Sequence, residues 1–346
     1  MTLSNTPVIE IERTGDPDVL TPGLRRLPLP GPGEVLIDNR VAAVNFVDTL
    51  IRSGAMPPGM MPSLPHVPGV EGAGIVAALG DGVTGLAVGS KVAWMGPVGV
   101  GGYGGRVVVS SEYCVPVADT LTLETAAAIP VNAMTAWHML VNLGGMDRLV
   151  QSRRDLGLPA PSVLIHSAAG GVGTLAVQLA RHLGAAVIAT CSAGKLEFVR
   201  ALGADAVLDH RREDLASQIL LATAGRGVDL SLNPVAGPTL RRDLGLLAPM
   251  GGVILFGFLA GLPEGDFATD LAGAITRSVF LRVSDIYSYF NTDAAAFSAD
   301  LRRVLDLAAA GVLIPRVTAL PLARAGEAHR LLESGQSMGK LVLAVG

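Results

Sequence analysis

A short glycine-rich segment, Ser167–Gly173 (SAAGGVG), separates an apolar run from a helical pattern, and it restricts the possible folds more than any other part of the chain. The apolar run Val163–His166 is predicted as a buried strand, and Val172–Leu183 as the helix that follows. Gly170 allows the backbone to approach a pyrophosphate, and Gly173 allows the helix to lie close to the sheet. The free N–H groups at the start of the helix then attract phosphates. The segment therefore predicts a dinucleotide site; the alternative is a glycine-rich turn without a ligand.

Strands and helices alternate from Ser162 onward, which predicts a doubly wound parallel sheet. The chain before Thr122 shows short strands broken by glycine and proline, a pattern typical of a partly open β-barrel. Between these parts, Asp147–Pro161 is charged and polar and is predicted as an exposed loop. With 346 residues, we expect an α/β protein of two domains. Residues 1–128 and 294–346 form the barrel domain, and residues 129–293 form the dinucleotide-binding domain.

Composition excludes several classes of protein. Half of the residues are hydrophobic and 16% are charged, with a net charge of −4, so neither a disordered chain nor a nucleic-acid partner is expected. The two cysteines, Cys114 and Cys191, are too few for a disulfide framework or a multi-cysteine metal site. No apolar run reaches the roughly 20 residues of a membrane helix. Met1–Glu12 lacks the pattern of a signal peptide, so we predict a cytoplasmic protein with no membrane partner.

The end of the second strand of the parallel sheet indicates which dinucleotide is bound. An NAD site normally carries Asp or Glu there for the ribose 2′-hydroxyl, but this strand ends in Ala189–Ser192 (ATCS). Ser192 and Lys195 follow the strand, and His210 follows the next one. Small polar and cationic groups suit a 2′-phosphate, so we predict NADPH. The alternative for Lys195 is an ordinary solvated charge.

Several separate motifs resemble one family. They are Asn45–Gly54 (NFVDTLIRSG), Val67–Gly74 (VPGVEGAG), Gly82–Val92 (GVTGLAVGSKV), Ala126–Leu140 (AAAIPVNAMTAWHML) and Val163–Gly184 (VLIHSAAGGVGTLAVQLARHLG). Their order is similar to that of the medium-chain dehydrogenase/reductase superfamily, and within it to the zinc-independent quinone oxidoreductases related to zeta-crystallin. The resemblance runs from about residue 34 to residue 346. It implies a GroES-like catalytic domain, a Rossmann domain, NADPH and a homodimer.

A second resemblance keeps another activity open. Val163–Gly203 is similar to the enoyl reductase domains of polyketide synthases, and Leu232–Gly237 (LNPVAG) resembles their L-N-S-x-x-G turn.

The zinc enzymes of the superfamily carry ligands where this chain has Asn45, Val70 and a position near Val131. None of these three is a zinc ligand, so no metal site is predicted.

The predicted cofactor contacts come from the motifs above and from the ends of the strands. They are Asn45, Thr135, Ala169, Gly170, Gly171, Val172, Gly173, Ser192, Lys195, His210, Asn233, Val235, Phe256, Gly257, Phe258 and Lys340. The resemblance implies that Asn45 lies in the nicotinamide pocket, that Thr135 touches the carboxamide, and that Lys340 approaches the cofactor. The alternatives are an Asx-turn residue for Asn45 and an ordinary helix threonine for Thr135.

Asn45 and Tyr287 are the predicted catalytic residues. The Asn45 amide would hydrogen-bond the acceptor oxygen, and the Tyr287 hydroxyl would approach it from another direction. Asp48 is expected to support its loop or to pair with Arg52. His166 is expected to be hydrogen-bonded within the sheet rather than catalytic.

Two departures from the family favour a particular substrate. Relatives often carry tyrosines where this chain has the apolar residues Leu50 and Met56, and the tyrosine near Met56 is a proposed proton donor in enoyl reductases. A quinone needs no such side-chain acid, because water can supply its protons. We therefore predict an enzyme that transfers hydride from NADPH to a quinone or other α,β-unsaturated carbonyl. A 2-enoyl thioester reductase and a non-catalytic NADPH-binding protein stay as alternatives. The apolar segment Val279–Val283 is predicted as the edge strand through which a homodimer forms.

Overall fold

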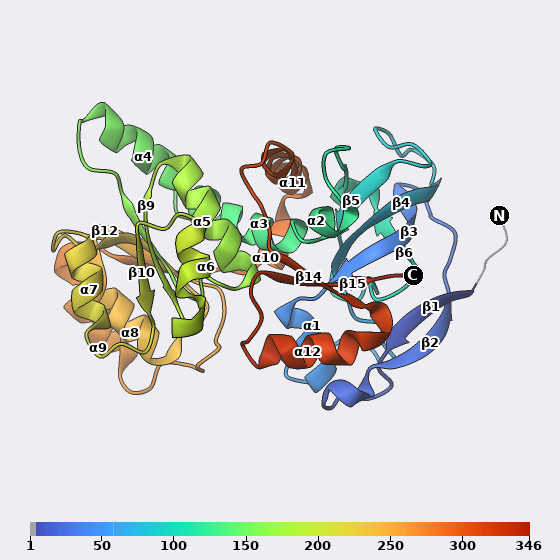
Figure 1. Ribbon diagram of the computed structural model, residues 1–346, viewed down its shortest axis with the longest axis horizontal. Coiled ribbons are helices and arrows are strands. Elements are labelled where there is room, and N and C mark those ends of the chain that lie inside the picture. Colours follow the sequence, from blue (N-terminus) through green and yellow to red (C-terminus); the bar gives the residue numbers. More distant parts are fainter. Residues whose placement is uncertain (1–4, 58) are drawn as a thin grey trace. The chain divides into compact units, whose positions relative to one another are not determined.

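The computed structural model describes residues 5–57 and 59–346 (Figure 1). Residues 1–4 and 58, which fall within the predicted barrel domain, lie outside the described part. The chain divides into two compact units. The first consists of Met1–Met134 with Tyr289–Gly346, and the second is Thr135–Ser288.

The second unit is built on a six-stranded sheet in the order β10-β9-β8-β11-β12-β13, in which all neighbouring strands are parallel. The strands are β8 (Ser162–Ile165), β9 (Ala186–Cys191), β10 (Ala206–Asp209), β11 (Val228–Asn233), β12 (Leu247–Leu255) and β13 (Phe280–Val283). The chain runs outward from β8 to one edge and then returns to continue from β11 to the other edge. This order confirms the predicted doubly wound sheet. Its switch point lies between the neighbouring strands β8 and β11, where the strand order changes direction.

Helices cover both faces of this sheet. They are α4 (Met146–Asp155), α5 (Gly171–Leu183), α6 (Leu196–Ala201), α7 (Leu215–Ala222), α8 (Gly237–Leu246) and α9 (Phe267–Gly273). Figure 1 shows α5 and α6 on one side of the sheet and α7, α8 and α9 on the other. Leu164 and Val253 of the sheet belong to the same buried cluster as Leu240 and Leu244 of α8. The apolar strands are therefore buried between two helical layers, as a parallel sheet requires.

The prediction of an exposed loop over Asp147–Pro161 is wrong for its first part, because Met146–Asp155 forms helix α4, and it is confirmed for residues 156–160. Its two buried residues, Met146 and Val150, are four positions apart and lie on one face of the helix. The rest of the helix is polar, so its apolar stripe is too narrow to stand out in the sequence.

The first unit contains a mixed sheet in the order β14-β15-β3-β4-β5-β7, with β6 paired to β3, and a separate pair β1-β2. The strands are β1 (Asn5–Glu10), β2 (Thr21–Arg26), β3 (Glu34–Ala43), β4 (Glu71–Leu79), β5 (Lys91–Met95), β6 (Arg106–Ser110), β7 (Cys114–Pro116), β14 (Val317–Pro321) and β15 (Lys340–Ala344). All pairs are antiparallel except β14 with β15. The C-terminal strand β15 pairs with β3, so the end of the chain completes the sheet that its beginning starts.

Among the described residues, four α-helices belong wholly to the first unit: α1 (Phe46–Ser53), α2 (Leu123–Ala127), α11 (Ala294–Ala309) and α12 (Ala325–Glu333). The unit boundaries fall within α3 (Pro130–Trp137), which continues as a π-helical turn, and within α10 (Ile286–Thr292). Trp94 and Tyr103 are the largest fully buried side chains, and both belong to this unit. Within residues 5–57 and 59–346, no helix is long and apolar enough to cross a membrane.

Candidate active site

In the first unit, three polar side chains from distant parts of the sequence meet in the interior. Asn45 precedes α1, Glu71 begins β4 and Lys340 begins β15, and all three are buried. The Lys340 ammonium lies 2.5 Å from Glu71 Oε1 and donates to Asn45 Oδ1 at 2.5 Å. The Asn45 amide in turn donates to Glu71 Oε1 at 2.9 Å. The structure thus brings together two predicted site residues, Asn45 and Lys340, through a carboxylate that was not predicted.

Glu71 also reaches the start of helix α3. Its second oxygen, Oε2, accepts from the backbone N–H of Val131 at 2.7 Å. A carboxylate is favoured there because the first N–H groups of a helix have no partner within the helix. The signal in the sequence was a single acidic residue at the start of an otherwise apolar strand (EGAGIVAAL). A buried carboxylate needs a counter-charge or hydrogen-bond donors, and for Glu71 these are supplied by Lys340, Asn45 and the N–H of Val131.

Next to this cluster, the carboxylate of Asp48 is also fully buried. It accepts from the backbone N–H groups of Asn45 at 2.8 Å and Gly69 at 3.0 Å. The Tyr103 hydroxyl lies 3.3 Å from it and 3.0 Å from His329 Nε2. Asp48 therefore supports its loop, as expected, whereas the pairing with Arg52 is wrong. The Arg52 guanidinium pairs with Glu333 of α12 instead, because Asp48 points inward, toward backbone N–H groups.

Burial governs the acid–base properties of this second cluster. Desolvation raises the pKa of Asp48 to about 6, although the N–H donors of Asn45 and Gly69 and the charge of Lys340 act in the opposite direction. Desolvation lowers the pKa of His329 to about 3, and the positive charge of Arg52 adds to this effect. Near neutral pH, Asp48 is therefore charged and His329 is neutral.

We expect Asp48→Asn to change how stability depends on pH. The carboxyl titrates near 3.9 in an unfolded chain and near 6 here, so between these values the folded protein binds more protons than the unfolded one. The contribution of Asp48 to stability is therefore present below about pH 4 and is lost as pH rises through 6. Urea unfolding from pH 4 to 7 should show the wild type losing about 2 to 3 kcal/mol relative to the variant. A difference that stays constant over this range would contradict the expectation.

In the second unit, the glycine-rich turn joins β8 to α5 as the sequence predicted. Gly170 is the N-cap of α5 with an extended backbone, and no side chain caps the helix. The N–H groups of Gly171, Val172 and Gly173 are the first of the helix and can receive a ligand. A Cβ at Gly173 would lie 2.7 Å from the Cα of Ala168 and closer still to the Ser167 carbonyl oxygen. The uncapped helix and the close approach of the backbone both fit a dinucleotide phosphate.

The residues predicted to meet the adenosine end lie after β9 and β10. The backbone N–H of Lys195 donates to the Ser192 carbonyl at 2.9 Å, which makes one short turn after β9. His210 Nδ1 lies 3.0 Å from the Cys191 carbonyl oxygen, so the imidazole of the half-exposed His210 faces the end of the neighbouring strand. These three residues therefore gather at the carboxyl ends of two adjacent strands.

Another turn follows β11 and connects to the end of β12. The Asn233 side-chain oxygen accepts from the N–H groups of Val235 at 2.8 Å and Ala236 at 2.9 Å. The N–H of Phe256 donates to the Asn233 carbonyl at 3.1 Å. A Cβ at Gly257 would lie 2.7 Å from the Pro234 carbonyl oxygen, so this glycine allows the two segments to touch. Phe258 is about half exposed.

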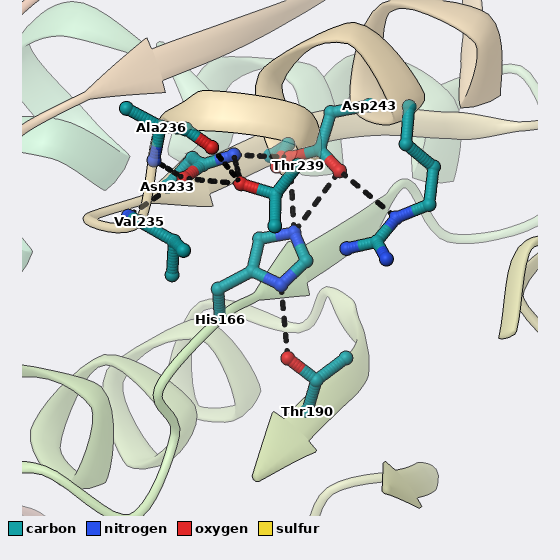
Figure 2. Close-up of polar contacts among 9 residues, drawn as sticks. His166, Thr190, Asn233, Val235, Ala236, Thr239 and Asp243 are labelled. Carbon is teal, nitrogen blue, oxygen red and sulfur yellow. Dashed lines mark hydrogen bonds and ion pairs between the residues drawn. The ribbon is translucent and has the colours of Figure 1, made fainter. Parts of the chain in front are cut away.

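Beneath these turns lies a buried polar cluster (Figure 2). His166 Nδ1 is 2.9 Å from Thr190 Oγ1, and His166 Nε2 is 2.9 Å from Asp243 Oδ2. His166 is therefore hydrogen-bonded within the fold, as the sequence predicted. Burial alone would raise the pKa of Asp243, but the charge of His166 and the hydrogen bonds of its neighbours hold that pKa below its usual value.

The remaining predicted residues lie near the unit boundaries. Thr135 is buried in α3, and Tyr287 is half-buried in α10; both belong to the second unit, whereas Asn45 and Lys340 belong to the first. The hydroxyl of Tyr289 donates to Asp300 at 2.8 Å.

Asn132, which was not predicted, is buried at the start of α3, and within the described chain its amide nitrogen has no hydrogen-bond partner. A buried amide of this kind suits a polar ligand atom.

Side chains of the metal-binding types are dispersed in the described part of the chain. Among residues 5–57 and 59–346, no three His, Cys, Asp or Glu side chains come together in a group able to hold a metal ion. Asn45, Val70 and Val131 occupy the positions compared with zinc ligands above.

Two family models match the chain. One, described as the alcohol dehydrogenase GroES-like domain, covers residues 31–119, and the other, described as zinc-binding dehydrogenase, covers residues 171–309. The first match lies in the unit with the mixed sheet, and the second begins at the glycine-rich turn of the parallel sheet. Together they confirm the predicted fold class, a GroES-like domain combined with a Rossmann sheet.

Individual relatives agree with these matches. A 2-haloacrylate reductase from Burkholderia sp is 31% identical over 96% of this chain and 97% of its own length. A phenolphthiocerol/phthiocerol polyketide synthase from Mycobacterium tuberculosis is 34% identical over 97% of this chain, which spans only 15% of that much longer protein. The crystal structure of Escherichia coli quinone oxidoreductase complexed with NADPH has a TM-score of 0.84 and 28% identity. It covers 98% of this chain and 100% of its own.

The chain thus matches relatives in sequence and in fold along nearly its whole length. The protein therefore belongs to the medium-chain dehydrogenase/reductase superfamily of oxidoreductases and is similar to its quinone oxidoreductases.

Proposed function

We propose that this protein is an NADPH-dependent oxidoreductase that reduces a quinone or another α,β-unsaturated carbonyl without zinc. The observation that carries the proposal is the uncapped, glycine-lined start of α5 at the switch point of a Rossmann sheet. The similarity of the whole chain to a quinone oxidoreductase crystallised with NADPH supports the choice of cofactor. In this proposal, residues 129–293 bind most of the cofactor, and residues 1–128 with 294–346 bind the acceptor and supply the predicted cofactor contacts Asn45 and Lys340.

The choice of NADPH over NADH rests on the ends of β9 and β10. Strand β9 ends at Cys191 and is followed by Ser192, so this strand end carries no Asp or Glu of the kind that usually holds the ribose 2′-hydroxyl of NAD; the carboxylate of Asp209 belongs to the neighbouring strand β10. Lys195 and His210 stand close to this strand end and would meet a 2′-phosphate. A cation and an imidazole attract that group, whereas a carboxylate would repel it.

In the first unit, the cluster of Asn45, Glu71 and Lys340 would hold the acceptor oxygen. A bound NADPH would supply the hydride. Glu71 and Asn45 take two of the three N–H groups of Lys340, and Glu71 takes one of the two amide N–H groups of Asn45. The remaining donors of Asn45 and Lys340 would stabilise negative charge on the acceptor oxygen as it develops. Glu71 would keep both donors oriented.

One observation favours a second candidate, reduction of 2-enoyl thioesters. The chain is 34% identical to part of a polyketide synthase, and its Asn233 turn resembles that of enoyl reductase domains. Against this, Leu50 and Met56 stand where relatives often carry tyrosines, one of them a proposed proton donor. A quinone can take its protons from water, so the apolar residues suit the first candidate better.

Calorimetry followed by turnover assays tests the proposal. We expect the purified protein to bind NADPH more tightly than NADH, and to oxidise NADPH when quinones or enones are added. Faster turnover with 2-enoyl thioesters would select the second candidate. Tight binding of NADPH without turnover of any acceptor would indicate a non-catalytic binding protein. No uptake of NADPH, or stoichiometric zinc by elemental analysis, would refute the proposal.

We further propose that the protein forms a homodimer through strand β13, which is the last strand of the parallel sheet. Val283 of this strand is 68% exposed, and Ile275 just before the strand is 77% exposed. An apolar edge strand offers both unpaired backbone groups and apolar area to a second copy.

Val283→Lys is therefore expected to shift the protein from dimer to monomer at micromolar concentration, as measured by light scattering. The matched control is Leu221→Lys, at a residue that is 73% exposed on α7, near the opposite edge strand β10. The control should stay dimeric. A wild type that is already monomeric would overturn this proposal.

A further inference from the structure

We propose that Asp243, on helix α8, is a positioning residue for the dinucleotide: its carboxylate holds together the turns that contact the cofactor. This inference rests on the proposed binding of NADPH. Asp243 was not among the predicted site residues, and its side chain lies beneath the turns rather than at the glycine-rich turn itself (Figure 2).

The carboxylate is the centre of a cluster of donors from three strands. His166 Nε2, just after β8, lies 2.9 Å from Oδ2 and 3.1 Å from Oδ1. The hydroxyl of Ser231 donates at 2.7 Å and the amide of Asn233 at 2.8 Å, both to Oδ2 and both from β11. Strand β9 joins through Thr190, whose hydroxyl lies 2.9 Å from the other ring nitrogen of His166. The members of this cluster are almost completely buried.

Three of these side chains, those of His166, Thr190 and Asn233, stand next to segments that are proposed to contact the cofactor. His166 directly precedes Ser167 of the glycine-rich turn, and its N–H donates to the Leu232 carbonyl of β11 at 3.1 Å. The Ala168 N–H donates to the Thr190 carbonyl at 3.0 Å, so the glycine-rich turn is tied to the end of β9 as well. Thr190 lies two residues before Ser192.

The turn after β11 depends on the cluster most directly. Asn233 uses its amide to donate to Asp243 and its side-chain oxygen to accept from Val235 and Ala236. Ala236 has φ 57° and ψ −139°, a conformation that strains the backbone and that L-residues rarely adopt. The two hydrogen bonds to Asn233 compensate for this strain. Figure 2 shows Asn233 between Asp243 and this turn.

The same turn also connects the Asp243 cluster to the segment that follows β12. The N–H of Ala260 donates to the Val235 carbonyl at 2.7 Å, and that of Leu259 donates to the Pro234 carbonyl at 3.1 Å. The segment Phe256–Phe258 therefore rests on the turn that Asn233 holds. Through these contacts, one buried carboxylate connects the glycine-rich turn, the end of β9, the Asn233 turn and the Phe256–Phe258 segment.

Loss of this carboxylate should weaken cofactor binding more than it impairs chemistry. In Asp243→Asn the negative charge is lost and one of the two acceptor oxygens becomes an NH2 donor. At the Oδ2 place this donor would face His166, Ser231 and Asn233, and at the Oδ1 place it would face the N–H of His166, so either arrangement weakens the cluster. We expect the Kd for NADPH, measured by calorimetry, to rise about 10- to 100-fold. The KM for NADPH should rise in parallel. The kcat at saturating NADPH should change less than about twofold, because Asp243 touches no reacting atom.

Asp229→Asn is the matched control. Asp229 is also buried and lies on β11, but at the opposite end of the strand, where it accepts from Ser162 N–H at 2.7 Å and pairs with Arg153 and Arg226. This variant should lose stability in urea unfolding yet keep the Kd of the wild type. An effect of merely lower stability would appear in both variants.

Ser231→Ala is a milder second variant, in case Asp243→Asn does not fold. It removes one donor and keeps the carboxylate, and we expect the Kd for NADPH to rise about fivefold. If the wild type binds NADPH and either folded variant binds it equally well, the inference is wrong while the proposed function stands. If the wild type does not bind NADPH, the proposed function itself fails.

Discussion

Gly173→Ala is expected to abolish tight binding of NADPH and to destabilise the second unit. The added methyl group would lie 2.7 Å from the Cα of Ala168 and closer still to the Ser167 carbonyl oxygen, so helix α5 and the glycine-rich turn would have to separate. Backbone atoms cannot move aside as a flexible side chain can. Overpacking of this kind costs about 1 to 3 kcal/mol. The separation would also displace the N–H groups that are proposed to hold the phosphates.

The matched control is the same substitution at another helical glycine. Gly245 lies within α8, and a Cβ there meets no atom within 4 Å. Gly245→Ala should therefore stabilise the protein by up to about 1 kcal/mol, because alanine favours a helix more than glycine does. Urea unfolding and calorimetric titration of both variants make the comparison. Normal affinity in Gly173→Ala would mean that the close helix–turn contact is not required for binding.

The second large effect is expected for Glu71→Gln. This change removes the carboxylate that pairs directly with the buried ammonium of Lys340 at 2.5 Å. Breaking a buried ion pair by removing one partner costs about 3 to 5 kcal/mol. The variant should also disturb Asn45 and the start of α3, because Glu71 accepts from the Asn45 amide and the Val131 N–H. We expect a large decrease in the urea midpoint together with a loss of turnover.

Two further variants show whether the effect comes from the buried charge. In Asp38→Asn, a pair between half-exposed side chains is broken in the same unit, where Arg106 lies 2.7 Å from Asp38. This variant should lose less than about 1 kcal/mol. The double variant Glu71→Gln/Lys340→Met removes both charges of this pair and should recover part of the stability lost in Glu71→Gln. Equal losses in Glu71→Gln and Asp38→Asn would contradict the argument.

These predictions differ in how far the sequence anticipated them. The role of Gly173 follows from a strand, a glycine spacing and a helix that lie together within about 20 residues. The structure places the turn between β8 and α5 as the pattern indicated. Helix α4 was missed because its stripe of Met146 and Val150 is narrow in an otherwise charged segment. The stability of such a helix depends on which parts of the fold its few apolar side chains contact.

Glu71 and Asp243 could not be assigned in the same way. Each is a single acidic residue in a mostly apolar or helical segment, and nothing beside it in the sequence names a partner. Lys340 is separated by 295 positions from Asn45, and Asp243 by 77 from His166. Likewise, Asp48 was expected to support its loop or pair with Arg52, and only the fold shows that two backbone N–H groups hold it while Arg52 meets Glu333.

Local sequence patterns were sufficient to predict the doubly wound sheet and the glycine-rich turn, and residue identity alone shows that Asn45, Val70 and Val131 are not of zinc-ligand types. These properties depend on hydrophobic period, on glycine geometry and on residue identity, all of which act over a few neighbouring residues. Tertiary structure alone decided which carboxylates are buried and which donors meet them. Desolvation and hydrogen bonding depend on which segments the fold brings into contact, and those segments come from distant parts of the chain.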